Sequence, residues 1–320
     1  MKFVLITLIF VIVLFLYLHI FFHIKTSNDL EVYECETPDK DKLEEICGLR
    51  QPVIFSYVDD LHNVCNIDNL KQHYSSFDFK IRNTFNDIVD EEELYIPLQL
   101  SQLSDVLKDD KDSKYISERN EEFLEDTGLI KSFKYNDALL RPYFTVKSEY
   151  DIMTGSVNSK TPFRYNMNYR NYYNVINGNV KIKMSPPKNS KFLYEIKDYD
   201  NYEFRSELNP WNVSDMHKGN FDKIKCLEFT LYKGQLVFIP AYWWYSIEYG
   251  DDTVIISYKY HTYMSMLSIC QHQIIALLQS QNIKRVPYLN IINDGNINAK
   301  TDISFNTTSD CSNISTEGEL

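Results

Sequence analysis

The feature that most constrains the fold is an unbroken apolar run near the N-terminus. Residues 3–22, FVLITLIFVIVLFLYLHIFF, contain no Asp, Glu, Lys or Arg. At a rise of about 1.5 Å per residue, this run forms a helix about 30 Å long, which matches the hydrocarbon thickness of a bilayer. A cleaved signal peptide usually has a shorter apolar region that ends in a small-residue cleavage site. The sequence therefore predicts an uncleaved transmembrane anchor over residues 1–24 and a single-pass membrane protein.

The sequence does not predict the orientation of this anchor in the membrane. Positive charge marks the cytoplasmic side, and here Lys2 and Lys25 flank the run almost symmetrically. Sequons at Asn212, Asn306 and Asn313 would be glycosylated in a lumenal or exterior domain. The chain holds 24 Tyr and is rich in Asn, Ile and Lys, a bias that AT-rich genomes produce, including those of large DNA viruses. If the source is viral, we expect the anchor in a host-cell or virion membrane.

The bulk composition excludes several classes of protein. With 320 residues, of which 44% are hydrophobic, the chain can build a substantial core and is not disordered throughout. Its net charge of -12 argues against binding nucleic acid, since phosphates attract cationic proteins. The six cysteines follow no C-x-x-C spacing, so the sequence does not predict a zinc site.

The texture of the sequence changes along the chain. Residues 25–141 mix short apolar runs with acidic helical stretches, whereas residues 142–262 consist of short β-branched and aromatic segments separated by turns. The turn signals Asn177-Gly178 and Lys233-Gly234 predict β-hairpins. Many short strands in succession predict a sandwich or a barrel.

Residues 263–292 return to helical spacing, and the polar tail 293–320 is predicted to be disordered. An apolar stripe runs along the first part of this helical segment and comprises Tyr263, Leu267, Cys270, Ile274 and Leu278. The stripe predicts a face packed in the core. The alternative is a homodimer formed through residues 263–281.

Two segments far apart in the sequence together resemble a known family. Residues 152–186 include Thr161-Pro162 followed by Arg164-Tyr165-Asn166, and residues 233–249 read KGQLVFIPAYWWYSIEY. In this order they resemble the motifs T-P-x-H-x-D and G-D-x-L-x-I-P-x-x-W-W-H of the Jumonji C (JmjC) cupin domain, as found in the asparaginyl hydroxylase that acts on hypoxia-inducible factor. The resemblance implies a mainly β fold, a double-stranded β-helix (cupin or jelly-roll barrel) with flanking helices, behind the N-terminal transmembrane helix.

Active members of the JmjC family hold Fe(II) with two histidines and one carboxylate and use 2-oxoglutarate. The resemblance places these three ligand positions on Arg164, Asn166 and Tyr245. Arginine stays protonated, asparagine offers only a neutral carbonyl, and a phenol has an ordinary pKa of about 10. Residues 152–194 contain no His, Asp or Glu, so a shifted register does not restore the ligands. His217 is the one remote histidine that could intrude.

Other positions of the family's site are only partly kept. Thr161 matches a family position that contacts 2-oxoglutarate, whereas the lysine that pairs with the distal carboxylate falls on Val180, with Lys181 beside it on the opposite strand face. Thr161, Arg164, Lys181 and Tyr245 would form a partial ligand site, and the alternative is an ordinary turn threonine and a solvated lysine. Seven cations and no acid lie within residues 152–194: Lys160, Arg164, Arg170, Lys181, Lys183, Lys188 and Lys191. They are either scattered over the surface or gathered in a basic concavity for an acidic ligand or partner.

Alternation along the strand predicts that Trp243 and Tyr245 share one face and that Trp244 lies on the other. Arg164, if it is buried, needs a carboxylate or carbonyl partner. From these patterns we predict a membrane-anchored JmjC-like protein without iron ligands or other cofactor, a pseudo-enzyme with a binding or structural role. The alternative is an Fe(II)/2-oxoglutarate-dependent hydroxylase or demethylase with a non-standard metal site. A structural protein with a filled barrel and no ligand is a third hypothesis.

Overall fold

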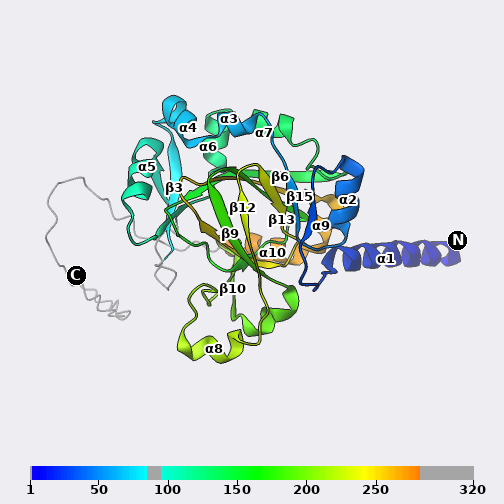
Figure 1. Ribbon diagram of the computed structural model, residues 1–320. Helices are drawn as coiled ribbons and strands as arrows, with labels where there is room; N and C mark the ends of the chain where they lie inside the picture. Colours follow the sequence, from blue (N-terminus) through cyan, green and yellow to red (C-terminus); the bar gives the residue numbers. More distant parts are fainter. Residues whose placement is uncertain (1, 85–94, 282–320) are drawn as a thin grey trace, which may run out of the picture. The chain divides into compact units, whose positions relative to one another are not determined.

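The computed structural model of the chain describes residues 2–84 and 95–281, and two β-sheets organise them (Figure 1). The predicted disordered tail 293–320, the last part of the predicted helical segment 263–292, and the sequons at Asn306 and Asn313 lie outside the described residues. Asn212 lies within them, on an exposed loop before helix α8.

The larger sheet has nine strands in the order β1-β2-β13-β8-β15-β6-β5-β3-β4. Its strands are β1 (Tyr33–Cys35), β2 (Val53–Ser56), β3 (Asp78–Asn83), β4 (Ile96–Gln99), β5 (Tyr115–Ser117), β6 (Thr145–Gly155), β8 (Arg170–Asn177), β13 (Gln235–Phe238) and β15 (Val254–Thr262). β2 pairs with β13 and β5 pairs with β6, so strands from residues 25–141 extend the sheet built by residues 142–262.

The smaller sheet has six strands in the order β10-β11-β7-β14-β9-β12. These are β7 (Arg164–Tyr165), β9 (Asn179–Ser185), β10 (Glu195–Asp198), β11 (Glu203–Ser206), β12 (Leu227–Tyr232) and β14 (Trp244–Tyr249). Buried apolar side chains from both sheets meet in one cluster that includes Met153, Val175, Ile182, Leu231, Val237 and Ile247. The two sheets therefore close over a common core, as in the expected double-stranded β-helix, and side chains fill its interior.

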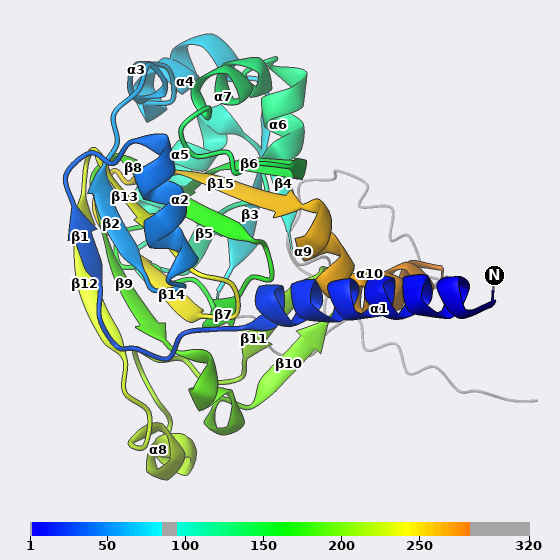
Figure 2. The same ribbon diagram turned by 90° about the vertical axis from the view of Figure 1, so that its right-hand side faces the viewer.

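Helices cover the outer face of the larger sheet (Figure 2). They are α2 (Lys40–Gly48), α3 (Leu61–Val64), α4 (Ile67–Tyr74), α5 (Leu100–Asp109), α6 (Glu121–Asp126) and α7 (Ile130–Asn136). Their apolar faces, with residues such as Leu43, Leu70 and Phe123, pack on outward-facing strand residues such as Phe55 and Phe79. A 3-10 helix, η1 (Pro187–Phe192), and helix α8 (Asp215–Phe221) lie in the connections of the smaller sheet.

The two predicted hairpins are wrong. β8 and β9 flank Gly178 but belong to different sheets, and so do β12 and β13 on either side of Gly234. Each turn is a corner at which the chain crosses from one sheet to the other. Gly178 has φ 71°, and a Cβ on it would lie 2.5 Å from the carbonyl oxygen of Asp251, so the corner requires glycine.

The prediction that the apolar stripe of residues 263–278 packs in the core is also wrong. The segment forms helices α9 (Tyr263–Ser268) and α10 (Cys270–Ser280), and the five stripe residues Tyr263, Leu267, Cys270, Ile274 and Leu278 are all exposed. The inward positions are instead Ser265 and Ile269, each two residues after a stripe residue and therefore on the opposite side of the helix.

Helix α1 (Lys2–Ile24) is long and apolar enough to cross a membrane, and a signal sequence would meet the same criterion. None of its residues is buried, so it is not a core helix of the domain. Its C-terminal end lies next to α9 (Figure 2).

Candidate functional site

The three residues at the family's ligand positions come together at one end of the barrel. β7 and β14 pair there, and Arg164 is the register partner of Tyr245. Asn166 follows β7 directly, and its Nδ2 donates a hydrogen bond of 3.0 Å to the Tyr245 hydroxyl. The three side chains therefore lie close together where β7 and β14 pair.

Asn166 and Tyr245 satisfy each other together with a third residue, Tyr173. The hydroxyls of Tyr173 and Tyr245 share a hydrogen bond of 2.7 Å, and Asn166 Nδ2 also donates to the Tyr173 hydroxyl at 3.0 Å. Burial, joined by the neighbouring Tyr245, raises the pKa of Tyr173 well above its ordinary value. Tyr173 therefore stays a neutral phenol at physiological pH.

Arg164 lies in a buried ion-pair network with Glu118, Glu203 and Arg82. Its Nη1 donates to Glu118 Oε1 at 2.8 Å and to Glu203 Oε1 at 2.9 Å, and its Nη2 donates to Glu118 Oε2. Arg82 Nη1 donates to both oxygens of Glu203, at 3.0 and 3.1 Å. The Tyr95 hydroxyl completes the network with a hydrogen bond of 2.6 Å to Glu118. Two guanidinium groups and two carboxylates balance in charge, which is how buried charges are tolerated.

The network keeps its carboxylates ionised. Burial by itself would raise the pKa of Glu118, but Arg164, Arg82 and Tyr95 together outweigh burial and hold that pKa far below its usual range. Burial likewise opposes ionisation of Glu203, and Arg82 and Arg164 together lower its pKa. Burial opposes the charge of Arg164, but Glu118, Tyr245 and Glu203 together outweigh burial and raise the Arg164 pKa. All four groups are therefore charged across the physiological pH range.

These residues do not fit Fe(II). A facial triad needs two imidazole nitrogens and a carboxylate oxygen with free lone pairs, whereas Arg164 has none to offer. Asn166 Nδ2 and the Tyr245 hydroxyl hydrogen-bond with each other and with Tyr173, and an amide and a phenol are not the imidazoles and carboxylate that the triad requires. Among the described residues, no group of three or more His, Cys, Asp or Glu is placed to hold a metal ion. His217 lies on α8 beside Tyr194 and Ser214 and does not enter the site.

Thr161 and Lys181 do not join this cluster. The Thr161 hydroxyl accepts the backbone N–H of Ile247 at 2.9 Å, so it fixes a turn against β14. Lys181 lies on the outer face of β9, with its Nζ 3.8 Å from Glu248 and 3.9 Å from Glu228. Its neighbour Val180 points into the barrel core, as strand alternation predicts.

The seven cations of residues 152–194 are scattered. Lys160 pairs with Glu248, Lys183 pairs with Glu228, and Arg170 is buried against Glu44. Of the seven, Arg164 alone lines the large cavity at this end of the barrel. The predicted basic concavity is therefore not formed.

The cavity beside Arg164 has a volume of about 900 Å³ and an acidic wall. Its charged lining comprises the carboxylates of Glu118, Glu121, Glu122, Glu125, Glu149, Asp151, Asp200 and Glu203, against Lys80, Arg119, Lys147, Arg164 and Lys259. Burial raises the pKa of Asp151 to about 6 and lowers that of His261 to about 4, so His261 adds no positive charge at neutral pH. The excess of carboxylates favours a cationic rather than an anionic occupant.

Sequence reasoning missed the partners of Arg164. Glu118 follows β5 and Glu203 begins β11, in segments that carry no family motif. The prediction that a buried arginine needs a carboxylate was sound, but only the pairing of β7 with β11 brings Glu203 to it. Tyr173 was missed because it lies within an apolar strand pattern. The expected separation of Trp243 and Tyr245 from Trp244 is confirmed, since the first two lie in the barrel core and Trp244 in a cluster outside it.

The fold is a cupin barrel of the JmjC-like type. The Cupin-like domain family matches residues 41–266, and the chain belongs to this family. It is also similar to HSPB1-associated protein 1 from Rattus norvegicus and from Homo sapiens, with 26% identity over 108 residues in each case. That segment covers 33% of this chain and 22% of the relatives.

Proposed function

We propose that this protein is a membrane-anchored, non-catalytic member of the JmjC-like cupins that binds a partner at the open end of its barrel. One observation carries the proposal: the side chains at the three positions already hydrogen-bond with neighbouring side chains. Arg164 is held by Glu118 and Glu203, and Asn166 and Tyr245 are held by Tyr173. A metal would have to displace this network and would find no imidazole there.

Two further observations support a partner over a purely structural role. The cavity of about 900 Å³ remains beside the network although the barrel core itself is filled. The relatives are named for association with another protein, HSPB1. The acidic wall suits a Lys- or Arg-rich segment of a protein partner, held by charge pairing at the cavity rim.

The membrane anchor is part of the same proposal. Helix α1 has no buried residue within the domain, so its apolar surface needs another environment. A bilayer provides one of matching thickness.

The catalytic alternative is tested by isothermal titration of the full chain in detergent with Fe(II) and 2-oxoglutarate under anaerobic conditions, followed by a succinate-release assay in air. We expect neither saturable iron binding nor succinate. Stoichiometric iron binding with turnover would establish the oxygenase instead.

The binding proposal is tested by thermal shift with an oligolysine peptide and with a dicarboxylate such as 2-oxoglutarate. We expect the peptide to stabilise the protein in a salt-dependent way and the dicarboxylate to have no effect. Replacing Glu121, Glu122 and Glu125 on α6 with Gln should abolish the shift. The matched control replaces with Gln three other glutamates, Glu31, Glu34 and Glu36, which are exposed and do not line the cavity. Equal responses of the two triple variants would refute the cavity as the site.

A further inference from the structure

The helices α9 and α10 expose an apolar surface without charge. Residues 263–281 contain no Asp, Glu, Lys or Arg, although 24% of the whole chain is charged. The exposed fraction is 67% for Tyr263, 54% for Ile274 and 59% for Leu278. The neighbouring strand β6 begins after Phe144, which is 82% exposed. An apolar surface of this kind marks a contact with something other than water.

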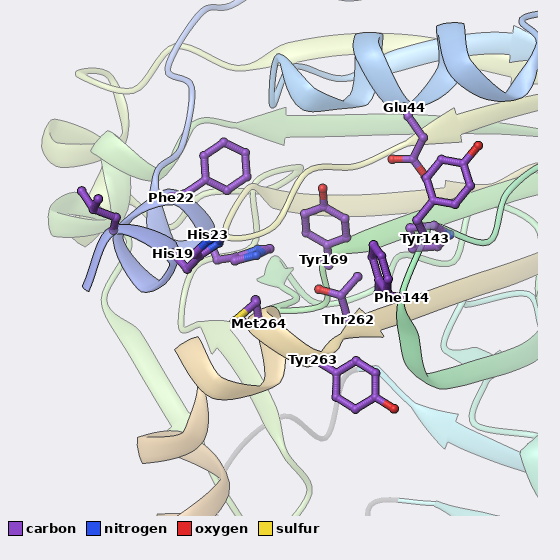
Figure 3. A pocket seen from close by; sticks show the side chains of 12 residues that line it. His19, Phe22, His23, Glu44, Tyr143, Phe144, Tyr169, Thr262, Tyr263 and Met264 are labelled. Carbon is purple, nitrogen blue, oxygen red and sulfur yellow. The ribbon is translucent and has the colours of Figure 1, made fainter. Parts of the chain in front are cut away.

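This surface adjoins the end of α1. α9 packs against α1, and a cavity of about 840 Å³ separates α1 from the segment around Phe144. Figure 3 shows His19, Phe22 and His23 of α1 on one side of this cavity, with Tyr169 and Phe144 of the domain across from them.

The domain is tied to α1 at this point by a specific contact. Arg50 Nη2 donates to the carbonyl oxygen of Phe22 at 3.4 Å, and the Arg50 guanidinium lies 5.2 Å from the centre of the Phe22 ring. Arg50 thus satisfies a carbonyl that the last turn of the helix leaves free. The end of α1 and the domain therefore hold a defined position relative to each other.

Depth in the membrane follows from these contacts. The cavity that Tyr263 and Met264 line also contains Leu18, four residues before Phe22 in the span. Four residues of helix correspond to about 6 Å, so α9 lies beside the last 6 Å or so of the transmembrane segment. Interfacial helices typically insert their apolar face about 5–10 Å into the boundary between headgroups and acyl chains.

We propose that the surface formed by Phe144, Tyr263, Ile274 and Leu278 is embedded in the lipid bilayer at the headgroup–acyl boundary. The domain then contacts the membrane directly and is not connected to it by α1 alone. The occupant of the surface is phospholipid, and lipid chains fill the cavity beside α1. Three tyrosines line that cavity from the domain, and the two exposed ones, Tyr143 and Tyr263, suit this depth, since aromatic residues with a polar tip concentrate at membrane interfaces. This inference rests on the proposed anchoring of α1.

The test uses the full chain in phosphatidylcholine vesicles, with one fluorescent amino acid incorporated in turn at Phe10, Phe144, Ile274 and Met216. Met216, on α8, is as exposed as Phe144 and serves as the reference. We expect lipids with a doxyl group near the headgroup to quench the probes at Phe144 and Ile274, with aqueous iodide ineffective there. At Met216 we expect aqueous iodide to quench the probe and the doxyl lipid to have no effect.

The probe at Phe10 separates the two levels of the proposal. If lipid quenches Phe10 while iodide reaches Phe144 and Ile274, α1 is an anchor but the domain does not sit in the interface. If lipid does not quench Phe10, the anchor fails and this inference fails with it. Shielding of Phe144 and Ile274 from both quenchers would assign the surface to a second copy of the chain or another protein segment.

A pair of variants checks that the surface itself causes the insertion. Ile274→Asp with Leu278→Asp should lower lipid quenching at Phe144 to the level of Met216, because a carboxylate is strongly disfavoured among acyl chains. The matched control is Met216→Asp with Tyr232→Asp, which adds the same charge at exposed positions away from this surface. Unchanged quenching at Phe144 in the first variant would overturn the inference.

Discussion

Replacing Arg164 with methionine tests the ion-pair network most sharply. The substitution keeps an unbranched side chain but removes every guanidinium contact to Glu118 and Glu203. Glu203 keeps Arg82, whereas Glu118 is left with the Tyr95 hydroxyl and with Arg82 at 3.7 Å. Breaking a buried ion pair by removing one partner typically costs about 3–5 kcal/mol, because a charge stays buried without compensation. We expect a loss of this size in the free energy of unfolding.

The measurement is equilibrium unfolding in urea of the detergent-solubilised chain, followed by the fluorescence of its three tryptophans. Lys181→Met is the control, since Lys181 is half-exposed with long contacts to its carboxylates, and such pairs contribute about 0–1 kcal/mol. The double variant Arg164→Met with Glu118→Gln should lose less free energy of unfolding than the two single variants lose together, by about 0.5–3 kcal/mol. Equal, small losses for Arg164→Met and Lys181→Met would refute the network as described.

Three further perturbations have defined outcomes. Tyr245→Phe removes a buried hydroxyl that hydrogen-bonds with both Asn166 and Tyr173 and should cost about 1–3 kcal/mol in urea unfolding, whereas Tyr232→Phe at an exposed position should cost nothing measurable. Gly178→Ala should destabilise by more than about 1 kcal/mol, since φ is 71° and the new Cβ meets backbone at 2.5 Å, in contrast to Gly219→Ala in open space. Burial in the native state raises the pKa of Asp151 from 3.8 to about 6, so protonation of Asp151 favours the folded protein. This contribution to the free energy of unfolding is fully present below pH 3.8 and is lost as the pH rises through about 6. Melting temperatures between pH 4 and 7 should show this fall, and Asp151→Asn should remove it; an unchanged slope in that variant would assign the fall to another group.

The sequence predicted the layout of the site better than its chemistry. Arg164 and Tyr245 are register partners on β7 and β14, and Asn166 directly follows β7, so the two sequence motifs do meet in the fold. Glu118 and Glu203 could not be predicted, since both reach Arg164 from segments distant in sequence, Glu203 through the pairing of β7 with β11 and Glu118 from the other sheet. The basic concavity failed for the same reason: strand alternation and long-range carboxylates distribute those cations over different surfaces.

The errors in the fold have physical causes as well. Asn177-Gly178 and Lys233-Gly234 have the composition of tight turns, but turn chemistry does not reveal whether the next strand joins the same sheet or the opposite one. The stripe on residues 263–278 has the period of a core helix. An apolar face that meets lipid has the same period as one that meets protein, so periodicity does not distinguish the two.

Metal analysis of the native protein tests the central claim most directly. The full chain is incubated anaerobically with excess Fe(II) and 2-oxoglutarate, separated from free metal by gel filtration, and analysed by inductively coupled plasma mass spectrometry. Because the three ligand positions carry a paired guanidinium, an amide and a phenol, we predict no more iron than in a denatured control. One iron per chain, lost in Tyr245→Phe, would contradict this account.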